Sequence, residues 1–190
     1  MSRGSLIIVS GPSGAGKGTL VKELLARVPD LWCAVSATTR LPRPDEREGE
    51  DYLFLTHEEF ERRVRDGRFI EWAEVHGNRY GTLRAPVEER LSRGETVVLE
   101  IDPQGAQQVK KAMPEAVLVF IEPPSMEELR RRLVGRGSED PAQVERRMRN
   151  AIEEMKIAGT YDFVVINDDV SRAAGELASI VRTISEEKDA

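Results

Sequence analysis

A glycine-rich segment constrains the fold of this chain more than any other feature. It spans residues 11–19 and reads GPSGAGKGT. The apolar run SLIIVS precedes it, and residues 17–27 have the pattern of a helix. A strand, a glycine-rich loop with a lysine, and a helix together make a P-loop, whose backbone N–H groups bind nucleotide phosphates. We therefore predict a phosphate-binding loop rather than a glycine-rich turn with an incidental lysine.

The loop departs from the usual P-loop pattern at Gly18, where a serine or threonine hydroxyl normally contacts Mg²⁺. Thr19 follows and can contact the metal directly or through a water. Phosphate binding does not depend on that hydroxyl, because the glycines and the helix N-terminus supply N–H groups and Lys17 supplies a positive charge. The GKGT variant is similar to the loop of adenylate kinases. The expected ATP-binding residues of the loop are Gly11, Pro12, Ser13, Gly14, Ala15, Gly16, Lys17, Gly18 and Thr19.

Short apolar runs alternate with helical patterns along most of the chain. After SLIIVS come the runs CAVSA, TVVLEI, AVLVFI and DFVVIN. Continuous Val, Ile and Leu runs indicate strands that are buried on both faces, as in a parallel sheet. Alternation with helices indicates βαβ units with right-handed crossovers. The sequence therefore predicts a three-layer α/β/α fold with a mainly parallel sheet.

Two segments interrupt this alternation. Residues 38–94 are polar and mixed, with YLFLT, RFIEWAEV and NRYGT as candidate short strands, which indicates a small α+β insertion. Residues 130–149 form a second excursion with two glycines around Arg136, which indicates a mobile segment. We expect one domain over residues 1–190, with its core at about 1–37, 95–129 and 150–190.

Composition limits the classes of partner. The net charge of −6 argues against a general nucleic-acid binder. No apolar run approaches the roughly 20 residues of a membrane span, so we expect no membrane association. Cys33 is the only cysteine, so no intrachain disulfide can form, and a buried thiol in a reducing cytoplasm is the simplest interpretation.

The insertion begins with two arginines, Arg40 and Arg43, in a proline-punctuated segment that cannot be a regular helix. Their planar guanidinium groups could grip a second phosphate in bidentate fashion. A solvated loop is an equally good interpretation from spacing alone, because residues 45–48 are all charged.

Six blocks in order carry a family resemblance. They read GPSGAGKGT, VSATTRLPRPDEREGEDY, FIEWAEVHGNRYGT, VVLEIDPQG, IEPPSMEELRRRLVGRG and VINDD. Together they resemble the guanylate kinases over residues 6–177, and the second and third blocks are absent from other nucleoside monophosphate kinases. The resemblance implies ATP-dependent phosphorylation of GMP, and of dGMP, to GDP. It also implies that residues 38–94 bind GMP and that residues 130–149 form a lid over ATP.

The resemblance assigns the GMP site. Carboxylates accept hydrogen bonds from guanine N1–H and the 2-amino group, hydroxyls donate to O6, and cations and phenols hold the phosphate. Adenine would leave the carboxylates unpaired, which is costly in a buried site. The implied GMP-binding residues are Arg40, Arg43, Tyr52 and Tyr80 for the phosphate, Glu71 and Asp102 as carboxylates, and Ser36 and Thr82 as hydroxyls.

The resemblance also assigns the ATP side. Residues 130–149 hold seven arginines against three acids, which alone is typical of a solvated helix face. In the family they form the lid that neutralises charge on the transferring phosphoryl group. Asn167 would lie near the adenine, although a simple turn after a strand is an equally good interpretation. The implied catalytic residues are Lys17, Arg132, Arg136 and Arg147, and the implied Mg²⁺ contacts are Thr19 and Glu100, directly or through water.

Two other functions compete with this hypothesis. A non-catalytic guanylate-kinase-like module would bind other proteins through the GMP surface, but such modules typically lack the P-loop lysine or the lid arginines, which are present here as Lys17, Arg132 and Arg136. A kinase for another nucleoside monophosphate would also contain the P-loop, and Glu71 together with Asp102 argues for guanine instead.

Overall fold

The fold is built around a five-stranded parallel sheet, here called sheet A. In this computed structural model the described residues are 3–75, 77–134 and 141–189. The strand order is β2-β7-β1-β8-β9, and every neighbouring pair is parallel. The strands are β1 (Leu6–Ser10), β2 (Trp32–Cys33), β7 (Val97–Glu100), β8 (Val117–Glu122) and β9 (Phe163–Ile166).

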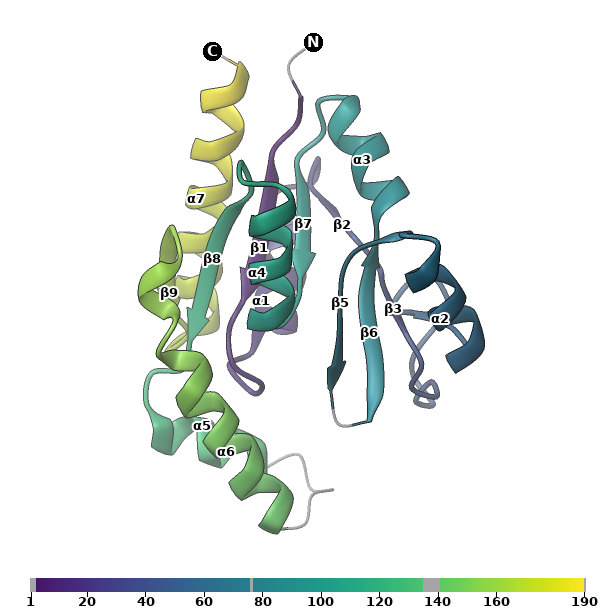
Figure 1. Cartoon of the computed structure of the whole chain (residues 1–190). Coiled ribbons are helices and arrows are strands. Elements are labelled where there is room, and N and C mark those ends of the chain that lie inside the picture. Colours follow the sequence, from purple (N-terminus) through teal and green to yellow (C-terminus); the bar gives the residue numbers. More distant parts are fainter. Residues whose placement is uncertain (1–2, 76, 135–140, 190) are drawn as a thin grey trace.

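Helices cover both faces of sheet A, because its central strand is apolar on both sides. Ile7 and Val9 of β1 belong to an apolar cluster with residues of α1 (Lys17–Arg27) and α7 (Val170–Asp189). Leu6 and Ile8 point the other way, into a cluster with α3 (Arg84–Ser92) and α4 (Pro103–Ala112). Figure 1 shows α4 in front of β1, with α7 on the far side. The predicted three-layer α/β/α architecture is confirmed.

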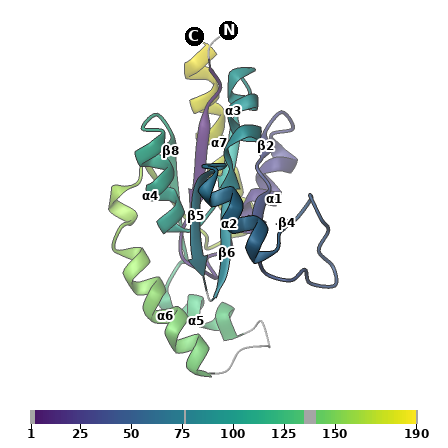
Figure 2. The same ribbon diagram turned by 45° about the vertical axis from the view of Figure 1, so that its right-hand side comes forward.

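A second sheet, sheet B, forms the insertion beside sheet A (Figure 2). Its order is β4-β3-β6-β5, with antiparallel pairs on both sides of β6 and a parallel β3–β4 pair. Helix α2 carries a capping box, in which Thr56 and Glu59 exchange hydrogen bonds at its start. The elements are β3 (Ser36–Thr38), β4 (Leu53–Phe54), α2 (His57–Arg65), β5 (Phe69–Val75) and β6 (Asn78–Leu83).

The run CAVSA is the one apolar run that does not form a single strand. Its first residue, Cys33, ends β2 in sheet A, whereas Ser36 begins β3 in sheet B. The last backbone bond to sheet A runs from the Ala34 N–H to the Val98 carbonyl, after which the chain pairs with β6 instead. This short stretch is therefore the link between the two sheets.

Two helices extend beyond the carboxyl end of sheet A. They are α5 (Met126–Val134) and α6 (Pro141–Met155), and a short 3₁₀ helix (Ala158–Thr160) leads back to β9. Leu129 and Leu133 of α5 form a small apolar cluster with Val144, Met148 and Ala151 of α6. The predicted lid spans these helices, but its residues 135–140, including Arg136, lie outside the described residues.

The two ends of the chain meet at the opposite end of sheet A (Figure 1). The Ser5 hydroxyl, just before β1, donates to the Ile184 carbonyl of α7 at 3.5 Å. None of the helices in the described ranges has the length and apolar character that crossing a bilayer requires.

Candidate active site

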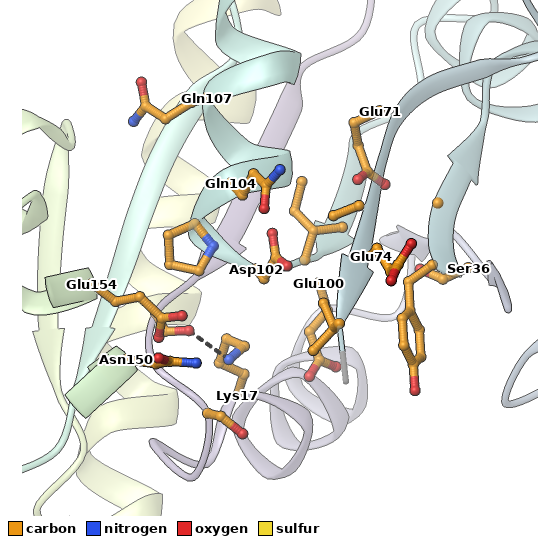
Figure 3. Close-up of a pocket in the computed structure, with 18 of the residues that line it drawn as sticks. Lys17, Ser36, Glu71, Glu74, Glu100, Asp102, Gln104, Gln107, Asn150 and Glu154 are labelled. Atoms are coloured by element: carbon orange, nitrogen blue, oxygen red, sulfur yellow. Dashed lines mark hydrogen bonds between the residues drawn. The ribbon is translucent and has the colours of Figure 1, made fainter. Parts of the chain in front are cut away.

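A cavity of about 760 Å³ lies between the carboxyl end of sheet A, sheet B and helix α6. This is the edge at which open α/β sheets bind their ligands. Figure 3 shows Lys17 and Glu154 on one side of it, and Ser36 and Glu71 on the other. The predicted site residues that line the cavity are Gly11, Ser13, Lys17, Ser36, Tyr52, Glu71, Tyr80, Glu100, Asp102 and Arg147.

The P-loop connects β1 to α1 at one side of this cavity. Gly11 and Gly16 have φ angles of 141° and 91°, which side chains rarely adopt. A Cβ atom at Gly11 would lie 2.3 Å from the Ile121 carbonyl oxygen, and one at Gly16 would lie 2.4 Å from Asn167 Nδ2. Both glycines are therefore required for the loop to pack against β8 and the end of β9.

Lys17 begins α1 and folds back over the loop. Its Nζ donates to the Gly11 carbonyl at 2.7 Å and to the Pro12 carbonyl at 3.1 Å. The ammonium thus lies within the cavity, at the N-terminus of a helix. Its positive charge and the N–H groups of the helix N-terminus both favour binding of an anion there. This arrangement can bind the phosphates of a nucleotide.

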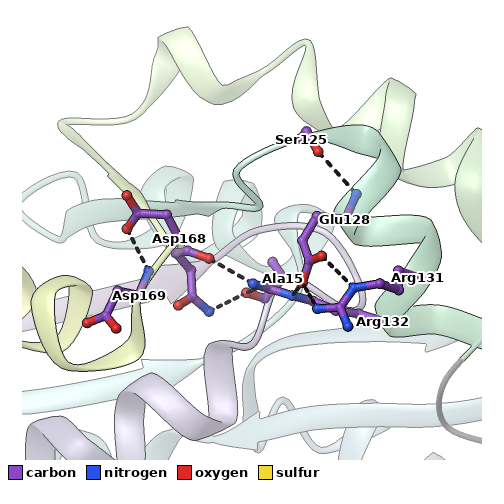
Figure 4. A network of polar contacts seen from close by, with 8 residues as sticks. Ala15, Ser125, Glu128, Arg131, Arg132, Asp168 and Asp169 are labelled. Carbon is purple, nitrogen blue, oxygen red and sulfur yellow. Dashed lines mark hydrogen bonds and ion pairs between the residues drawn. The ribbon is translucent and has the colours of Figure 1, made fainter.

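Asn167 and Arg132 both contact the P-loop at Ala15, and Figure 4 shows Arg132 beside Ala15 and Glu128. Asn167 is buried, and its Nδ2 donates to the Ala15 carbonyl at 2.7 Å. The Arg132 guanidinium donates to the carbonyls of Ala15 (3.3 Å) and Asn167 (3.0 Å), and its Nε donates to Glu128 at 2.8 Å. The hydrogen bonds from Arg131 and Arg132 lower the pKa of Glu128 to about 2. A contact of Asn167 with adenine stays a prediction.

Glu71 forms the opposite side of the cavity and is only 4% exposed. Its burial raises the pKa of its carboxyl to about 7, against a hydrogen bond from Thr82 that lowers it, and the charge of Asp102 raises it further. The Thr82 hydroxyl donates to Glu71 Oε1 at 2.7 Å. Thr82 is itself buried, so it orients the carboxylate, and its direct contact with guanine stays a prediction.

Helix α4 brings a second carboxylate and a glycine to Glu71. Asp102 caps α4 and accepts a hydrogen bond from the Gly105 N–H at 2.7 Å. A Cβ atom at Gly105 would lie 2.6 Å from Glu71 Oε2. The sequence separates Glu71 from Asp102 by 31 positions, and the packing of β5 on α4 brings them to one cavity.

The two predicted phosphate arginines lie in the loop before β4. The Arg40 guanidinium makes a bidentate pair with Glu46, at 2.9 and 2.8 Å, and lies 5.2 Å from the centre of the Tyr52 ring. This pairing lowers the pKa of Glu46 to about 2. The Arg43 side chain is 70% exposed and 3.9 Å from Glu46. Tyr52 and Tyr80 line the cavity, and Arg40 contacts Tyr52, whereas neither arginine lines the cavity itself.

The predicted Mg²⁺ contact Glu100 lies beside the start of α1, and its role in metal binding stays a prediction. Burial raises the pKa of Glu100, whereas the nearby Lys17 lowers it. A Cβ atom at Gly18 would lie 3.4 Å from Glu100 Oε1, and Thr19 is exposed in the same turn. Among the described residues no three His, Cys, Asp or Glu side chains gather to hold a metal. Mg²⁺ commonly uses one carboxylate, waters and substrate phosphates, so Glu100 fits this ion.

Helix α6 brings two further side chains to the P-loop. The Arg147 guanidinium donates to the Ser13 hydroxyl at 2.7 Å, as the expected lid arginine of this helix. Glu154, seven residues later, accepts a hydrogen bond from the Ser13 N–H, and burial raises its pKa while Lys17 lowers it. Its Oε2 is buried without a hydrogen-bond partner in the described structure. Sequence reasoning missed Glu154, although its spacing from Arg147 places both on one helix face.

These features define a P-loop phosphotransferase, in which a phosphate-binding loop faces a buried carboxylate across one cavity. A family model described as guanylate kinase matches residues 3–184. The guanylate kinase of Rubrobacter xylanophilus is 53% identical over 97% of this chain and 96% of its own length. That of Symbiobacterium thermophilum is 50% identical over 94% of this chain and 85% of its own length.

A solved structure agrees with these relatives. The crystal structure of guanylate kinase from Anaplasma phagocytophilum superposes with a TM-score of 0.80 and 36% sequence identity, over 96% of this chain and 87% of that one. The chain belongs to the guanylate kinase family. The predicted family is confirmed, and the enzyme interpretation is favoured over the non-catalytic module and over a kinase for another monophosphate.

Proposed function

We propose that ATP and GMP bind on opposite sides of the one cavity and that the protein transfers the γ-phosphoryl group between them. The observation that carries this proposal is the buried Glu71 carboxylate, which faces the P-loop side across about 760 Å³. A buried carboxylate needs hydrogen-bond donors. Guanine offers two on adjacent atoms, and adenine does not offer them.

On the GMP side, Glu71 and Asp102 accept from N1–H and the 2-amino group, and Ser36 donates to O6. The phosphate lies against the hydroxyls of Tyr52 and Tyr80. Arg40 and Arg43 reach it by exchanging Glu46 for the phosphate, because both guanidinium groups now lie against that one carboxylate. Recognition of the ribose is not required by any of these contacts, which is consistent with use of dGMP.

On the ATP side, the P-loop N–H groups and Lys17 hold the β- and γ-phosphates. Glu100, with Thr19 or a water, would hold Mg²⁺, which neutralises charge on the β- and γ-oxygens when bound. Arg132 and Arg147 approach from α5 and α6, and Arg136 lies outside the described residues. A cytoplasmic location and the absence of a nucleic-acid partner stay predictions.

The chemistry needs positioning and charge neutralisation more than covalent catalysis. An oxygen of the GMP phosphate forms a bond to the γ-phosphorus of ATP, and the bond from that phosphorus to the β–γ bridging oxygen breaks. GDP and ADP result. No strong base is needed, because the attacking oxygen is already anionic. Closure of the cavity excludes water, which would otherwise accept the phosphoryl group.

The test is an assay of ADP release with ATP, Mg²⁺ and each of GMP, dGMP, AMP, CMP and UMP. We expect turnover with the two guanine nucleotides only. Turnover with another monophosphate would overturn the base assignment and keep the kinase. No turnover, in a folded protein that still binds GMP, would overturn the proposed reaction in favour of a binding module.

A matched pair of variants tests the assignment of Glu71. Glu71→Ala should raise the KM for GMP and leave the KM for ATP near that of the unmodified protein, because the P-loop is on the other side of the cavity. Glu61→Ala is the control, since it removes an exposed glutamate from α2 of the same insertion that does not line the cavity. An unchanged KM for GMP in Glu71→Ala would refute the assignment.

A further inference from the structure

Strand β5 is the outer strand of sheet B, and a side chain pairs with its free edge. Gln108 of α4 makes two hydrogen bonds to Trp72. The Trp72 N–H donates to Gln108 Oε1 at 3.3 Å, and Gln108 Nε2 donates to the Trp72 carbonyl at 2.8 Å. A side-chain amide has a donor and an acceptor side by side, so it can pair with a peptide edge as a neighbouring strand would.

Gln108 belongs to a face of α4 that contacts β5. Asp102, Gly105 and Gln108 follow one another at intervals of three, so they lie along one side of the helix. Asp102 lines the cavity with Glu71, and Gly105 leaves the space that Glu71 Oε2 occupies. Gln108 then holds the peptide of Trp72, the residue directly after Glu71. This side of α4 therefore contacts two consecutive residues of β5. Asp102 and Gly105 lie beside Glu71, and Gln108 binds the backbone of Trp72.

The Trp72 ring does not provide this anchor. It lies edge-on to Phe60, with ring centres 6.5 Å apart, and the Arg79 guanidinium is 5.8 Å from it. Both partners belong to the insertion itself, in α2 and β6. Ile70 of β5 shares an apolar cluster with Ala106 and Val109 of α4, but such packing is not directional. The ladder with β6 aligns β5 within sheet B, and the two bonds to Gln108 are directional contacts that align β5 with α4.

We infer that Gln108 is a positioning residue for guanine recognition: its amide holds the backbone of β5 in the register that places Glu71 beside Gly105 and Asp102. This inference rests on the proposed role of Glu71. If β5 slipped along α4, Glu71 Oε2 would leave the space beside Gly105, where a Cβ atom would lie only 2.6 Å from it. Glu71 and Asp102 would then no longer be placed to accept hydrogen bonds from one guanine base. The P-loop, on β1 and α1, would not move.

The test compares Gln108→Ala with Lys111→Ala, which removes an exposed side chain of the same helix that does not line the cavity. The substrates are GMP and IMP, since IMP has N1–H and O6 but lacks the 2-amino group. Two modest hydrogen bonds predict a rise of about fivefold or more in the KM for GMP in Gln108→Ala, with kcat and the KM for ATP changed less than about twofold. The ratio of kcat/KM for GMP over IMP should fall in Gln108→Ala, whereas Lys111→Ala should change neither this ratio nor the KM for GMP.

Amide hydrogen exchange gives a second measurement that does not depend on activity. The Trp72 N–H should exchange faster in Gln108→Ala than in the unmodified protein, while N–H groups in β1 stay protected. Gln108→Glu keeps the acceptor for Trp72 N–H but places a second oxygen against the Trp72 carbonyl, so it should behave like Gln108→Ala.

Three results would overturn the inference. One is unchanged Trp72 exchange. The second is faster exchange with an unchanged GMP-to-IMP ratio. The third is an equal loss of all kinetic parameters together with a lower melting temperature, which would indicate general destabilisation. Failure of the proposed function is distinguishable, because the unmodified protein would then show no preference for GMP over IMP.

Discussion

Burial of the Glu71 carboxyl raises its pKa to about 7, so its charge changes within the range in which enzymes are assayed. The ionised form accepts both guanine donors, whereas the protonated form does not. We therefore expect the KM for GMP to rise as the pH falls below about 7, approaching about tenfold per pH unit. The measurement is the KM for GMP between pH 5.5 and about 9, with the KM for ATP as reference.

Glu71→Gln is the control for this pH dependence. The variant cannot ionise at this position, so its KM for GMP should be high, and its remaining pH dependence should be that of the GMP phosphate, whose second pKa is about 6. Protonation of Glu71 has opposite effects on GMP binding and on stability, since it weakens GMP binding but stabilises the folded protein. Because the folded state raises the pKa, protonation of Glu71 stabilises the protein at low pH, and this stabilisation disappears as the pH rises through about 7. A flat KM for GMP in the unmodified protein would contradict the role of Glu71.

Glu154 is, after Glu71 and Glu100, another carboxylate whose burial raises its pKa, and it lies among groups that should bind phosphate. It accepts from the Ser13 N–H and faces Lys17, so it occupies part of the anion site. We expect Glu154→Gln to bind ATP several-fold more tightly at pH 8, because a negative charge near the phosphates is removed. Calorimetric titration without GMP measures this affinity.

Glu115→Gln is the matched control for Glu154→Gln. Its side chain is 44% exposed and paired with Arg3 before the start of β8, so the same charge is removed away from the cavity. The affinity for ATP should stay unchanged in this variant. Weaker ATP binding in Glu154→Gln than in Glu115→Gln would mean that the Glu154 carboxylate supports the nucleotide-bound loop.

Sequence motifs identified individual residues of the candidate site, but they did not indicate which other residues these side chains contact. The motifs singled out Lys17 and Glu71, and both line the cavity. They did not indicate that Thr82 donates to Glu71 or that Arg40 is paired with Glu46. Such pairs depend on how strands and loops fold back on one another. Glu154 was missed because a glutamate on a charged helix resembles a solvated one until the P-loop lies beside it.

At the level of elements, Gly105→Ala in α4 should have two opposing effects, one on the stability of the helix and one on GMP binding. Alanine is favoured over glycine within a helix by about 1 kcal/mol, so Gly105→Ala should stabilise the helix. However, its Cβ would lie 2.6 Å from Glu71 Oε2 and 3.4 Å from Asp102 Oδ1. We expect the KM for GMP to rise by about tenfold or more, a penalty of roughly 1.4 kcal/mol for displaced acceptors. Steady-state kinetics with varied GMP measures it.

Gly175→Ala in α7 is the control for Gly105→Ala, because it should change helix stability without changing GMP binding. Its Cβ would meet only the end of the Arg27 side chain, at 3.3 Å, and that flexible group can move. This variant should keep the KM for GMP of the unmodified protein and gain a little thermal stability. A Gly105→Ala protein with normal GMP kinetics would show that the space beside Glu71 is not needed.

Elements were predictable from the sequence where local signals were strong. Helix α1 occupies Lys17–Arg27, the predicted residues, and the apolar runs around residues 6, 97, 117 and 163 form strands of sheet A. The run CAVSA divides between two sheets, which no local pattern indicates, because Val, Ala and Cys suit either one. The contact between α4 and Trp72 was equally invisible, since it joins elements from different layers.

For the whole molecule, the proposed GMP side of the cavity is formed mainly by sheet B, with Asp102 from after the end of β7, and the proposed ATP side by sheet A. GMP should therefore hold sheet B to sheet A as it binds. A ligand at 100 times its Kd stabilises the folded state by about 2.7 kcal/mol, so GMP should raise the melting temperature by several degrees. Differential scanning fluorimetry with GMP, AMP and ATP measures these shifts.

The thermal shifts have an internal control. Glu71→Gln should lose most of the shift with GMP and keep the shift with ATP, and AMP should give little shift at the GMP side. Equal shifts with GMP in both proteins would contradict base recognition by Glu71. The sequence predicted an α+β insertion at residues 38–94, because this segment is polar and mixed and interrupts the alternation of apolar runs with helical patterns.

The meeting of the two chain ends has a consequence for the connectivity of the molecule. Ser5 and Ile184 are in contact, at the end of sheet A that is far from the cavity (Figure 1). A short linker could join the ends, and new ends could be opened at the exposed turn around Gly67, between α2 and β5. The order of the elements along the chain would change, while every wall of the cavity would stay in its place. The arrangement of the cavity thus depends on how the elements pack and does not depend on the order in which the chain connects them.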